Sequence, residues 1–262
     1  MRNKSFVILR REWLELKRQR ELLLGISLMP ALLTLIPIVI TYAVQYVPDS
    51  FQQPLPFEKV NPVLQGMTHV ERQQTFIGQT FAVLLLLIPL IVPSIIASYS
   101  IIGEKLGRTL EPVLATPVTT GELLFGKCLA AGIPAVVITW ICAVIFITGL
   151  SLVTVSRRVL TAVVSPGWLI VLILCVPLIV MIAVTAMVAI SSRVNDPRTA
   201  QQISGVAVIP VMTIFFGQLA GVLVLNPLFA LASAVVLVVL AVASISLAIR
   251  IFQREVILTR WT

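Results

Sequence analysis

Residues 168–190 read WLIVLILCVPLIVMIAVTAMVAI, a run without any Lys, Arg, Asp or Glu. An α-helix rises about 1.5 Å per residue, so about 20 apolar residues cross the roughly 30 Å of hydrocarbon in a bilayer. Backbone groups in lipid need partners within the segment or in a closed barrel. A run this long and this uniformly apolar therefore predicts a membrane-spanning helix.

Five more apolar runs accompany this one, and none of them contains a charged residue. The six predicted spans are residues 22–46, 80–102, 128–150, 168–190, 203–225 and 228–249. The chain of 262 residues is 58% hydrophobic and 11% charged, whereas soluble proteins are about 25% charged. The sequence predicts an all-α integral membrane protein, with residues 22–262 forming one six-helix transmembrane domain.

Residues 1–21 precede the first span and carry a different pattern. Phe6, Leu9, Trp13 and Leu16 recur at helical spacing, and most of the basic residues lie off that stripe. This pattern predicts an amphipathic helix that lies in the headgroup region of the membrane. A soluble tail next to the membrane is the alternative.

The orientation follows from the basic residues, which concentrate on the cytoplasmic side. Fifteen of the 19 Lys and Arg residues lie in the N-terminal stretch, in the second and fourth connections and at the C-terminal end; the other four lie in the alternate loops. Both termini are therefore predicted to be cytoplasmic, and residues 47–79 to form an external loop. The net charge of +8 suits anionic membrane lipids as partners, and no basic soluble domain points to nucleic acid.

The longest cytoplasmic connection, residues 103–127, reads GEKLGRTLEPVLATPVTTGELLFGK. Its first charged residues are predicted to extend the helix of the second span, and Pro112 and Pro117 to bend the chain. Thr119 and Glu122 fit a capping box that starts the next helix. Mixed charges favour ion pairing with a partner over lipid binding, although an ordinary solvated loop is equally compatible with the residues.

Residues 121–128 nearly match a phosphate-binding loop, but two features argue against a nucleotide site. No strand precedes them, and Cys128 stands where the motif needs Ser or Thr. The single histidine, His69, cannot form a two-histidine metal site or an intramembrane Ser-His pair, and no carboxylate lies in a predicted span. We therefore expect neither an enzyme nor a catalytic, cofactor-binding or metal-binding residue in this chain.

Two sets of residues in the spans are candidates for helix packing or for a translocation path. Gly217 and Gly221 form a GxxxG motif that allows close helix approach, within the chain or between subunits. Polar side chains at depth could face a path, although Ser and Thr in helices commonly bond to their own backbone. These polar residues are Ser94, Ser98, Ser100, Thr185, Thr213 and Gln218.

The run E-x-x-x-R-T-L-E-P-x-L-A-T-P-V from Glu104, followed by G-E-x-x-x-G-K from Gly121, resembles the cytoplasmic loop of ABC type-2 exporter permeases. It is most similar to the group of bacterial sodium-extrusion permeases. The amphipathic N-terminal segment, the six spans and the C-terminal stretch 252–260 extend the resemblance over nearly the whole chain. Many members of that group have a larger external domain in place of residues 47–79, so sodium is not assigned as substrate.

The resemblance implies a membrane subunit of an exporter in a bacterial or archaeal cytoplasmic membrane. It implies a dimer with a second copy or a paralogue, on two ATPase subunits that bind ATP and magnesium. Residues 103–127 would be the coupling segment and residues 1–21 the connecting helix. The coupling candidates are Glu104, Arg108, Glu111, Pro117 and Glu122. A non-transporting scaffold that anchors a cytoplasmic complex is the alternative function, and the substrate stays open among ions, drugs, lipids and peptides.

Overall fold

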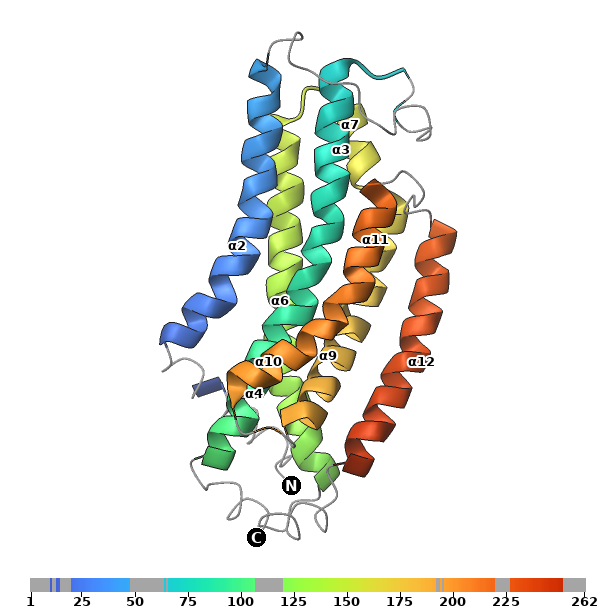
Figure 1. Ribbon diagram of the computed structural model, residues 1–262. Coiled ribbons are helices and arrows are strands. Elements are labelled where there is room, and N and C mark those ends of the chain that lie inside the picture. The colour runs from blue at the N-terminus through green and yellow to red at the C-terminus, as the bar shows by residue number, and fades with distance from the viewer. Residues whose placement is uncertain are drawn as a thin grey trace.

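The structure is a computed structural model, and Figure 1 shows its bundle of long helices. It describes residues 10, 13–14, 20–47, 64, 66–106, 120–191, 194, 196–219 and 227–251. For residues 20–22, 104–106, 120–124, 218–219 and 249–251 it describes the backbone alone. Within these ranges every regular element is a helix, so the predicted all-α class is confirmed.

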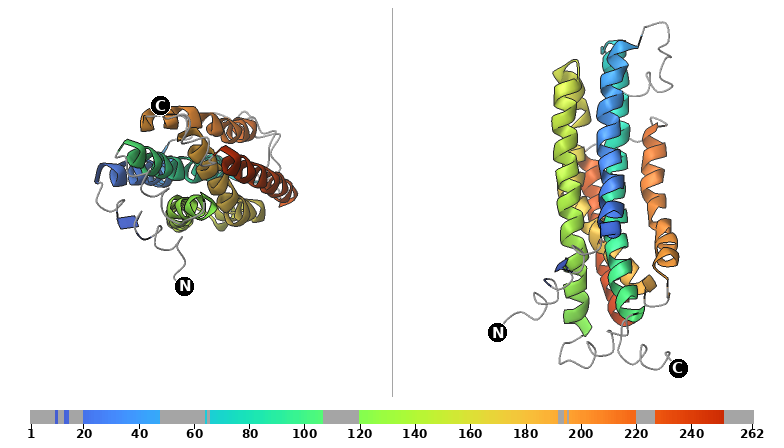
Figure 2. Two further views of the ribbon diagram at one scale, coloured as in Figure 1. Left: turned by 90° about the horizontal axis from the view of Figure 1, so that it is seen from below. Right: turned by 90° about the vertical axis from the view of Figure 1, so that its left-hand side faces the viewer.

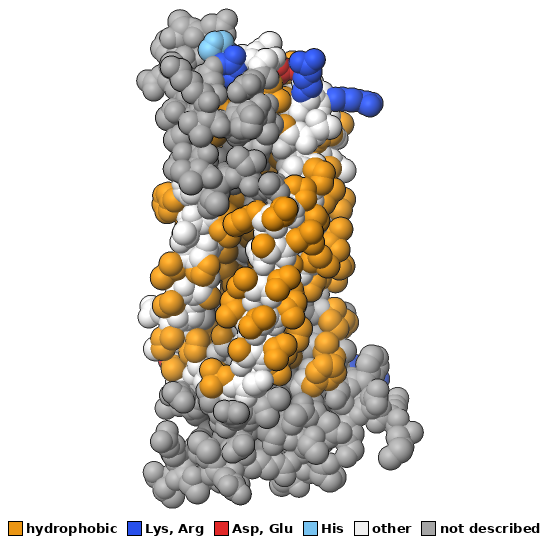
Figure 3. All heavy atoms as spheres, turned by 90° about the vertical axis from the view of Figure 1, so that its right-hand side faces the viewer, with side chains coloured by type: hydrophobic (Ala, Val, Ile, Leu, Met, Phe, Trp, Pro, Cys, Tyr) orange, Lys and Arg blue, Asp and Glu red, His pale blue; other side chains and the backbone are white. Residues whose placement is uncertain are grey.

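Six helical stretches are long and apolar enough to cross a membrane, which confirms the predicted number of spans. They are Leu23–Tyr46, His69–Gly103, Phe125–Val153, Pro166–Ser191, Pro197–Gly217 and Pro227–Ala248. Hydrophobic side chains are spread over the whole middle of the face of the bundle seen in Figure 3, and Lys and Arg side chains gather at its upper end. This surface is what a bundle surrounded by lipid requires.

The helices run as follows along the chain. They are α2 Arg20–Ala43, η1 Val44–Tyr46, α3 His69–Leu84, η4 Leu85–Leu87, α4 Ile88–Leu106, α6 Thr120–Val153, α7 Arg157–Val163, α8 Pro166–Ile170, η5 Val171–Cys175, α9 Val176–Ser191, α10 Pro197–Ser204, η6 Gly205–Val208, α11 Ile209–Leu219 and α12 Pro227–Ile251. Helix α4 packs on α2, α6, α9 and α10, and α9 in turn packs on α6 and α12. Viewed along the bundle in Figure 2, α4 lies among these neighbours.

The two ends of the bundle are named here by the helices that meet there. The inner end is where α4 ends, α6 begins and α12 ends, at the bottom of Figure 1; the outer end is where α2 ends and α3 begins. These names follow the orientation predicted from the basic residues, which stays a prediction.

Burial differs widely among the spans. In the most apolar stretch of His69–Gly103, 67% of the residues are buried, whereas in Pro197–Gly217 only 11% are. The second span is therefore the centre of the bundle. Because α4 packs on α2, α6, α9 and α10, a movement of α4 would displace these helices as well.

The second span begins earlier than the sequence predicts, at His69 instead of Thr80. Thr68 caps α3 in a capping box: its hydroxyl accepts from the Glu71 N–H at 3.4 Å, and the Glu71 carboxylate accepts from the Thr68 N–H at 2.8 Å. This cap starts the helix inside the segment predicted as an external loop, residues 47–79. The first turn consequently brings Glu71 and Arg72 into the spanning helix, which was expected to carry no charge.

The outer end is held together by one buried glutamine. Gln74 is fully buried; its Nε2 donates to the Thr41 carbonyl at 3.0 Å and to the Val153 carbonyl at 3.4 Å, and its Oε1 accepts from the Val155 N–H at 3.1 Å. Gln45 also donates to the Val153 carbonyl. These bonds fix the ends of α2, α3 and α6 relative to one another.

Candidate functional site

Helices α4 and α6 border the connection 103–127 at the inner end. Helix α4 continues past the membrane-spanning stretch to Leu106, and α6 starts at Thr120. The side chain of Lys127, only 4% exposed, donates from Nζ to Ser100 Oγ at 2.9 Å. A buried ammonium needs such a partner, because an unpaired charge is costly away from water. Lys127 thus ties the two helices together one or two turns from the ends they present to the connection.

A second polar contact joins α4 to α10. Gln201 Nε2 donates to Ser98 Oγ at 3.1 Å, and Ser98 is fully buried. Helix α10 lies across the inner end at an angle to α11 in Figure 1. Neither Lys127 nor Gln201 is among the five named coupling candidates, although Lys127 is the last residue of the predicted coupling segment 103–127.

Asp196 starts α10. Its Oδ2 accepts from the Thr199 N–H at 3.0 Å and from the Thr199 hydroxyl at 2.9 Å, in the geometry of an N-cap. These hydrogen bonds to Thr199, with a smaller contribution from Arg198, hold the pKa of the Asp196 carboxyl below its ordinary value. The carboxylate is therefore the form that stabilises the start of the helix.

Two tryptophans donate to backbone carbonyls that prolines have left without a helical donor. Trp13 Nε1 donates to the Ala130 carbonyl at 3.2 Å. The usual donor would be the N–H four residues later, but that residue is Pro134, which has none. The N-terminal segment is thereby fixed to α6 at a defined point.

Trp140 makes the equivalent bond to the fourth span. Residues Val171–Cys175 form a π-helical turn, in which the Val176 N–H bonds to the Val171 carbonyl. The next such bond would join residue 177 to the Leu172 carbonyl, but residue 177 is proline. Trp140 Nε1 donates to that carbonyl at 3.1 Å instead. Turns of this kind are frequent at functional sites.

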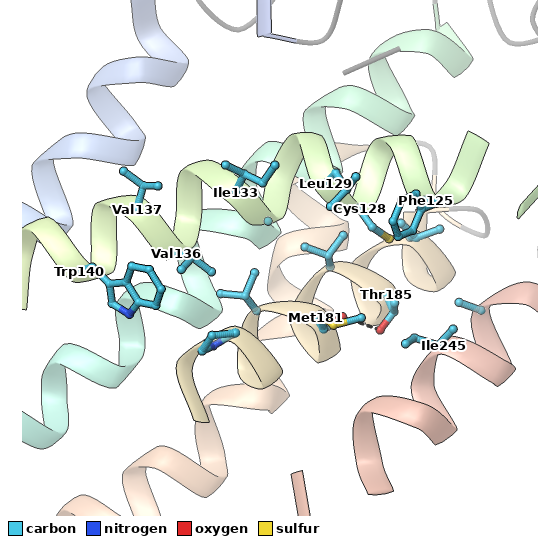
Figure 4. Close-up of a pocket in the computed structure, with 16 residues that line it drawn as sticks. Phe125, Cys128, Leu129, Ile133, Val136, Val137, Trp140, Met181, Thr185 and Ile245 are labelled. Atoms are coloured by element: carbon cyan, nitrogen blue, oxygen red, sulfur yellow. Dashed lines mark hydrogen bonds between the residues drawn. The ribbon is translucent and has the colours of Figure 1, made fainter. Parts of the chain in front are cut away.

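A groove of about 600 Å³ lies beside this π-helical turn, between α6, α9 and α12. Its lining comes from residues between 125 and 140 of α6, between 177 and 188 of α9, and from Ile245 and Ala248 of α12. Figure 4 shows Phe125 toward one end and Trp140 toward the other. Because these parts of α6, α9 and α12 are the parts nearest the inner end, the groove lies in that half of the membrane.

The comparisons with known proteins decide the family. Residues 6–232 match the model of a family described as ABC-2 family transporter protein. The chain belongs to the ABC-2 transporter family. No curated protein matches it. The resemblance found in residues 104–127 is thus confirmed at the level of the family, over most of the chain.

The coupling candidates of this ABC-2 transporter protein lie at or beyond the edge of the described residues. Glu104 is in the last turns of α4 and Glu122 in the first turn of α6, both with backbone alone described. Arg108, Glu111 and Pro117 lie outside the described residues. Their role in coupling stays a prediction. Residues 121–127, which nearly match a phosphate-binding loop, belong to helix α6.

The packing and path candidates divide in a similar way. Gly217 lies in α11, whereas Gly221 lies outside the described residues and the backbone alone is described for Gln218. Ser94, Thr185 and Thr213 each donate to a carbonyl of their own helix four residues earlier, at 2.7, 2.8 and 2.9 Å. Ser98 also donates to a carbonyl of its own helix, that of Ile95, at 2.9 Å. Ser98 and Ser100 in addition accept hydrogen bonds from the side chains of Gln201 and Lys127, which belong to other helices.

Sequence reasoning missed Lys127, Gln201 and the two tryptophan bonds. Lys127 could have been found, because a lone lysine at the start of an apolar run needs a buried partner or a route to water. The tryptophan bonds could not, because a proline shows which carbonyl is freed but not which side chain reaches it.

Proposed function

We propose that this ABC-2 transporter protein is the permease subunit of an ATP-driven exporter. It would form a translocation path as a dimer with a second copy or a paralogue, powered by two separate ATPase subunits. The observation that carries the proposal is the family match over residues 6–232. ATP and magnesium would bind in the partner subunits, and a bacterial or archaeal cytoplasmic membrane is the proposed location.

The inner end supports a coupling role for residues 103–127. The connection joins α4, which is central to the bundle, to α6, which packs on α2, α4 and α9. Because Lys127 ties α6 to Ser100 of α4, a push on the connection would move both helices together. Movement at the ATPase would in this way reach the centre of the bundle.

The N-terminal segment would provide a second contact with the ATPase. Trp13 bonds directly to α6 at Ala130, so a displacement of this segment would act on the same helix that begins at the coupling connection. Residues 1–21 and 103–127 would then both transmit the movement of the ATPase to helix α6. The GxxxG glycines, Gly217 and Gly221, are the proposed packing contact and face either this chain or the second copy.

The test is a double charge reversal, Glu104→Lys with Glu111→Lys, in the permease co-expressed with an ATPase subunit that co-purifies with it. We expect the ATPase to dissociate from the membrane fraction, or to stay bound while its activity no longer responds to the permease. The matched control reverses two charges at the outer end, Arg157→Glu with Arg158→Glu, both exposed on α7, and should leave association and activity unchanged.

A transport measurement distinguishes the exporter from the alternative, a non-transporting scaffold. A scaffold would bind the cytoplasmic partner through the same connection but would show no ATP-dependent movement of any compound across vesicles that contain the complex. If the double reversal left the ATPase bound and fully responsive, residues 103–127 would not be the coupling segment.

A further inference from the structure

The groove between α6, α9 and α12 is a feature of the described residues that the coupling proposal does not use. It is long and narrow. Residues 125–140 of α6 form one wall, and at about 1.5 Å per residue this wall is about 22 Å long. A volume of about 600 Å³ spread over that length leaves a mean cross-section of about 27 Å².

This cross-section decides between the possible occupants. An α-helix with its side chains is about 10–12 Å across, or roughly 80–110 Å² in section. A helix of a second copy is therefore too wide to enter the groove and could only cover it, whereas a single extended hydrocarbon chain fits inside. The wall is longer than one leaflet of the hydrocarbon core, which is about 15 Å thick, so the groove can follow an acyl chain through the whole depth of that leaflet.

The lining has no group to bind an ion or a polar head. None of the lining residues is charged, and the polar hydroxyl among them, on Thr185, lies 2.8 Å from the Met181 carbonyl oxygen and 3.0 Å from Ser244 Oγ. Its bonding capacity is used within the protein. A cation site would need several oxygen ligands, so the chemistry of this groove is that of a hydrocarbon.

The groove is also a defined structure and not merely a gap between helices. Pro177 contributes to its wall directly after the π-helical turn of the fourth span, and the Trp140 bond to the Leu172 carbonyl holds the indole at one end. The Thr185 contact with Ser244 holds α9 against α12 along another wall. Walls fixed by specific bonds keep their shape when the occupant leaves.

We propose that this groove binds one hydrocarbon chain of a membrane amphiphile that lies in the leaflet at the inner end. The polar head of the amphiphile would remain in the headgroup region, beyond Phe125. Binding itself does not require the exporter function. That the bound amphiphile is also the transported substrate rests on the proposed function.

The test is photo-crosslinking in phosphatidylcholine vesicles that contain a small fraction of phospholipid with a diazirine in one acyl chain. Mapped adducts should concentrate on groove positions such as Leu129, Val136 and Met181. Gly132→Leu should lower this labelling roughly tenfold, because the added side chain occupies the space of several methylenes. A β-carbon at residue 132 would lie 3.4 Å from Val180 Cγ1, so the first carbon of the added side chain meets no clash.

The control adds the same side chain outside the groove. Ala232→Leu, on the exposed face of α12, should leave the labelling unchanged. A second filling variant, Val137→Trp, starts from a side chain that is 45% exposed and so keeps the experiment decisive if Gly132→Leu fails to fold. Equal labelling of filled and unfilled grooves, or adducts spread evenly over all lipid-facing positions, would each overturn the proposal.

The two proposals fail separately. Absent groove labelling in a permease that still controls its ATPase would refute the binding site alone. Groove labelling in a permease that controls no ATPase would refute the exporter function alone. If both hold, ATP added to the complex should reduce groove labelling several-fold while the Lys127→Met variant, with its α4 to α6 tie removed, responds less.

Discussion

The outer end of the bundle and the inner part of α4 are held by different kinds of bonds. At the outer end, side chains bond across elements to backbone groups: Gln74 to α2 and to the end of α6, Gln79 to the Ala162 carbonyl of α7, and Trp168 to the Ala82 carbonyl of α3. At the inner end the polar contacts of α4, from Lys127 and Gln201, are between side chains.

This difference indicates which end can move. A bond to a backbone group fixes the position of a helix, since the backbone cannot turn away without breaking helical structure. A bond between two side chains can be exchanged for another by rotation about side-chain torsions. The outer end is therefore built to stay in place, while α4 and α10 can shift relative to each other at the inner end, where the coupling connection lies. Helix α6 keeps a backbone bond there, from Trp13 to the Ala130 carbonyl.

The largest effect should come from breaking the outer end at Gln74. Gln74→Leu leaves the Val155 N–H without its partner and removes a donor from the carbonyl of Thr41, which is buried, and from that of Val153, which is half-buried and keeps Gln45. We expect a loss of about 3 kcal/mol in the free energy of unfolding. Unfolding in mixed detergent and denaturant, followed by circular dichroism, measures it.

The matched inner-end variant is Gln201→Leu, which should cost about 1 kcal/mol or less, because Ser98 keeps its bond to the Ile95 carbonyl. Equal losses for Gln74→Leu and Gln201→Leu would remove the contrast between the two ends.

The close packing of α3 on α7 gives a second test of the outer end. A β-carbon at Gly78 would lie 2.5 Å from Val163 Cγ2, which is closer than atoms approach without rearrangement. Gly78→Ala should therefore cost about 1 to 3 kcal/mol. Val163→Ala in the same chain should recover most of that loss, as expected for residues in direct contact.

Gly103 provides the control, because a β-carbon there meets nothing within 4 Å. Gly103→Ala should be neutral or slightly stabilising, since alanine favours helix. The measurement is the unfolding midpoint of Gly78→Ala, of Val163→Ala, of the two combined and of Gly103→Ala. If Val163→Ala recovered none of the stability lost in Gly78→Ala, the contact of Gly78 with α7 would not be the cause of that loss.

Much of this fold can be predicted from the composition of single segments. The different bonds at the two ends of the bundle cannot, because they depend on which helices lie next to each other. The six spans could be predicted because each apolar run meets the length requirement by itself, without reference to its neighbours. The early start at His69 was missed although Thr68 and Glu71 carry the same capping pattern that was recognised at Thr119 and Glu122. Polar residues that follow this cap were taken for a loop.

The candidate site was less predictable, for a physical reason. The segment 103–127 differs from its surroundings in composition, so it could be found from sequence. The groove has the same apolar composition as the lipid-facing surface, so it becomes visible only when α6, α9 and α12 are placed side by side. Trp140 looks like an ordinary residue of the span until Pro177 is known to leave the Leu172 carbonyl without a donor.

That interpretation of Trp140 makes a smaller, more specific prediction on the inner-end groove. Trp140→Phe keeps a ring but removes the indole N–H, so the Leu172 carbonyl loses its donor and unfolding should become easier by about 1 kcal/mol. Pro177→Ala restores a backbone N–H at residue 177. In that background Trp140→Phe should cost almost nothing. An unchanged cost would mean that the indole acts through packing alone.

The smallest effect is expected at the exposed cap of α10, and it depends on pH. The pKa of Asp196 is lowered in the folded protein by its bonds to Thr199, so folding favours the carboxylate. The stabilisation is complete above the unfolded pKa of about 3.9 and is lost as the pH falls through the lower folded value. Asp196→Ala should lower the melting temperature slightly at neutral pH and leave no difference in strong acid.

Asp196→Asn separates the charge from the cap, since asparagine also accepts the Thr199 N–H. This variant should keep most of the neutral-pH stability but lose the acid dependence that Asp196 contributes. Melting temperatures are measured between about pH 2 and pH 7, a range that spans the titration of carboxyl groups. Because α10 contacts α4 through Gln201 and Ser98, these temperatures also report how firmly α10 is bound to α4. A change as large as that of Gln74→Leu would show that the inner end is fixed as firmly as the outer one.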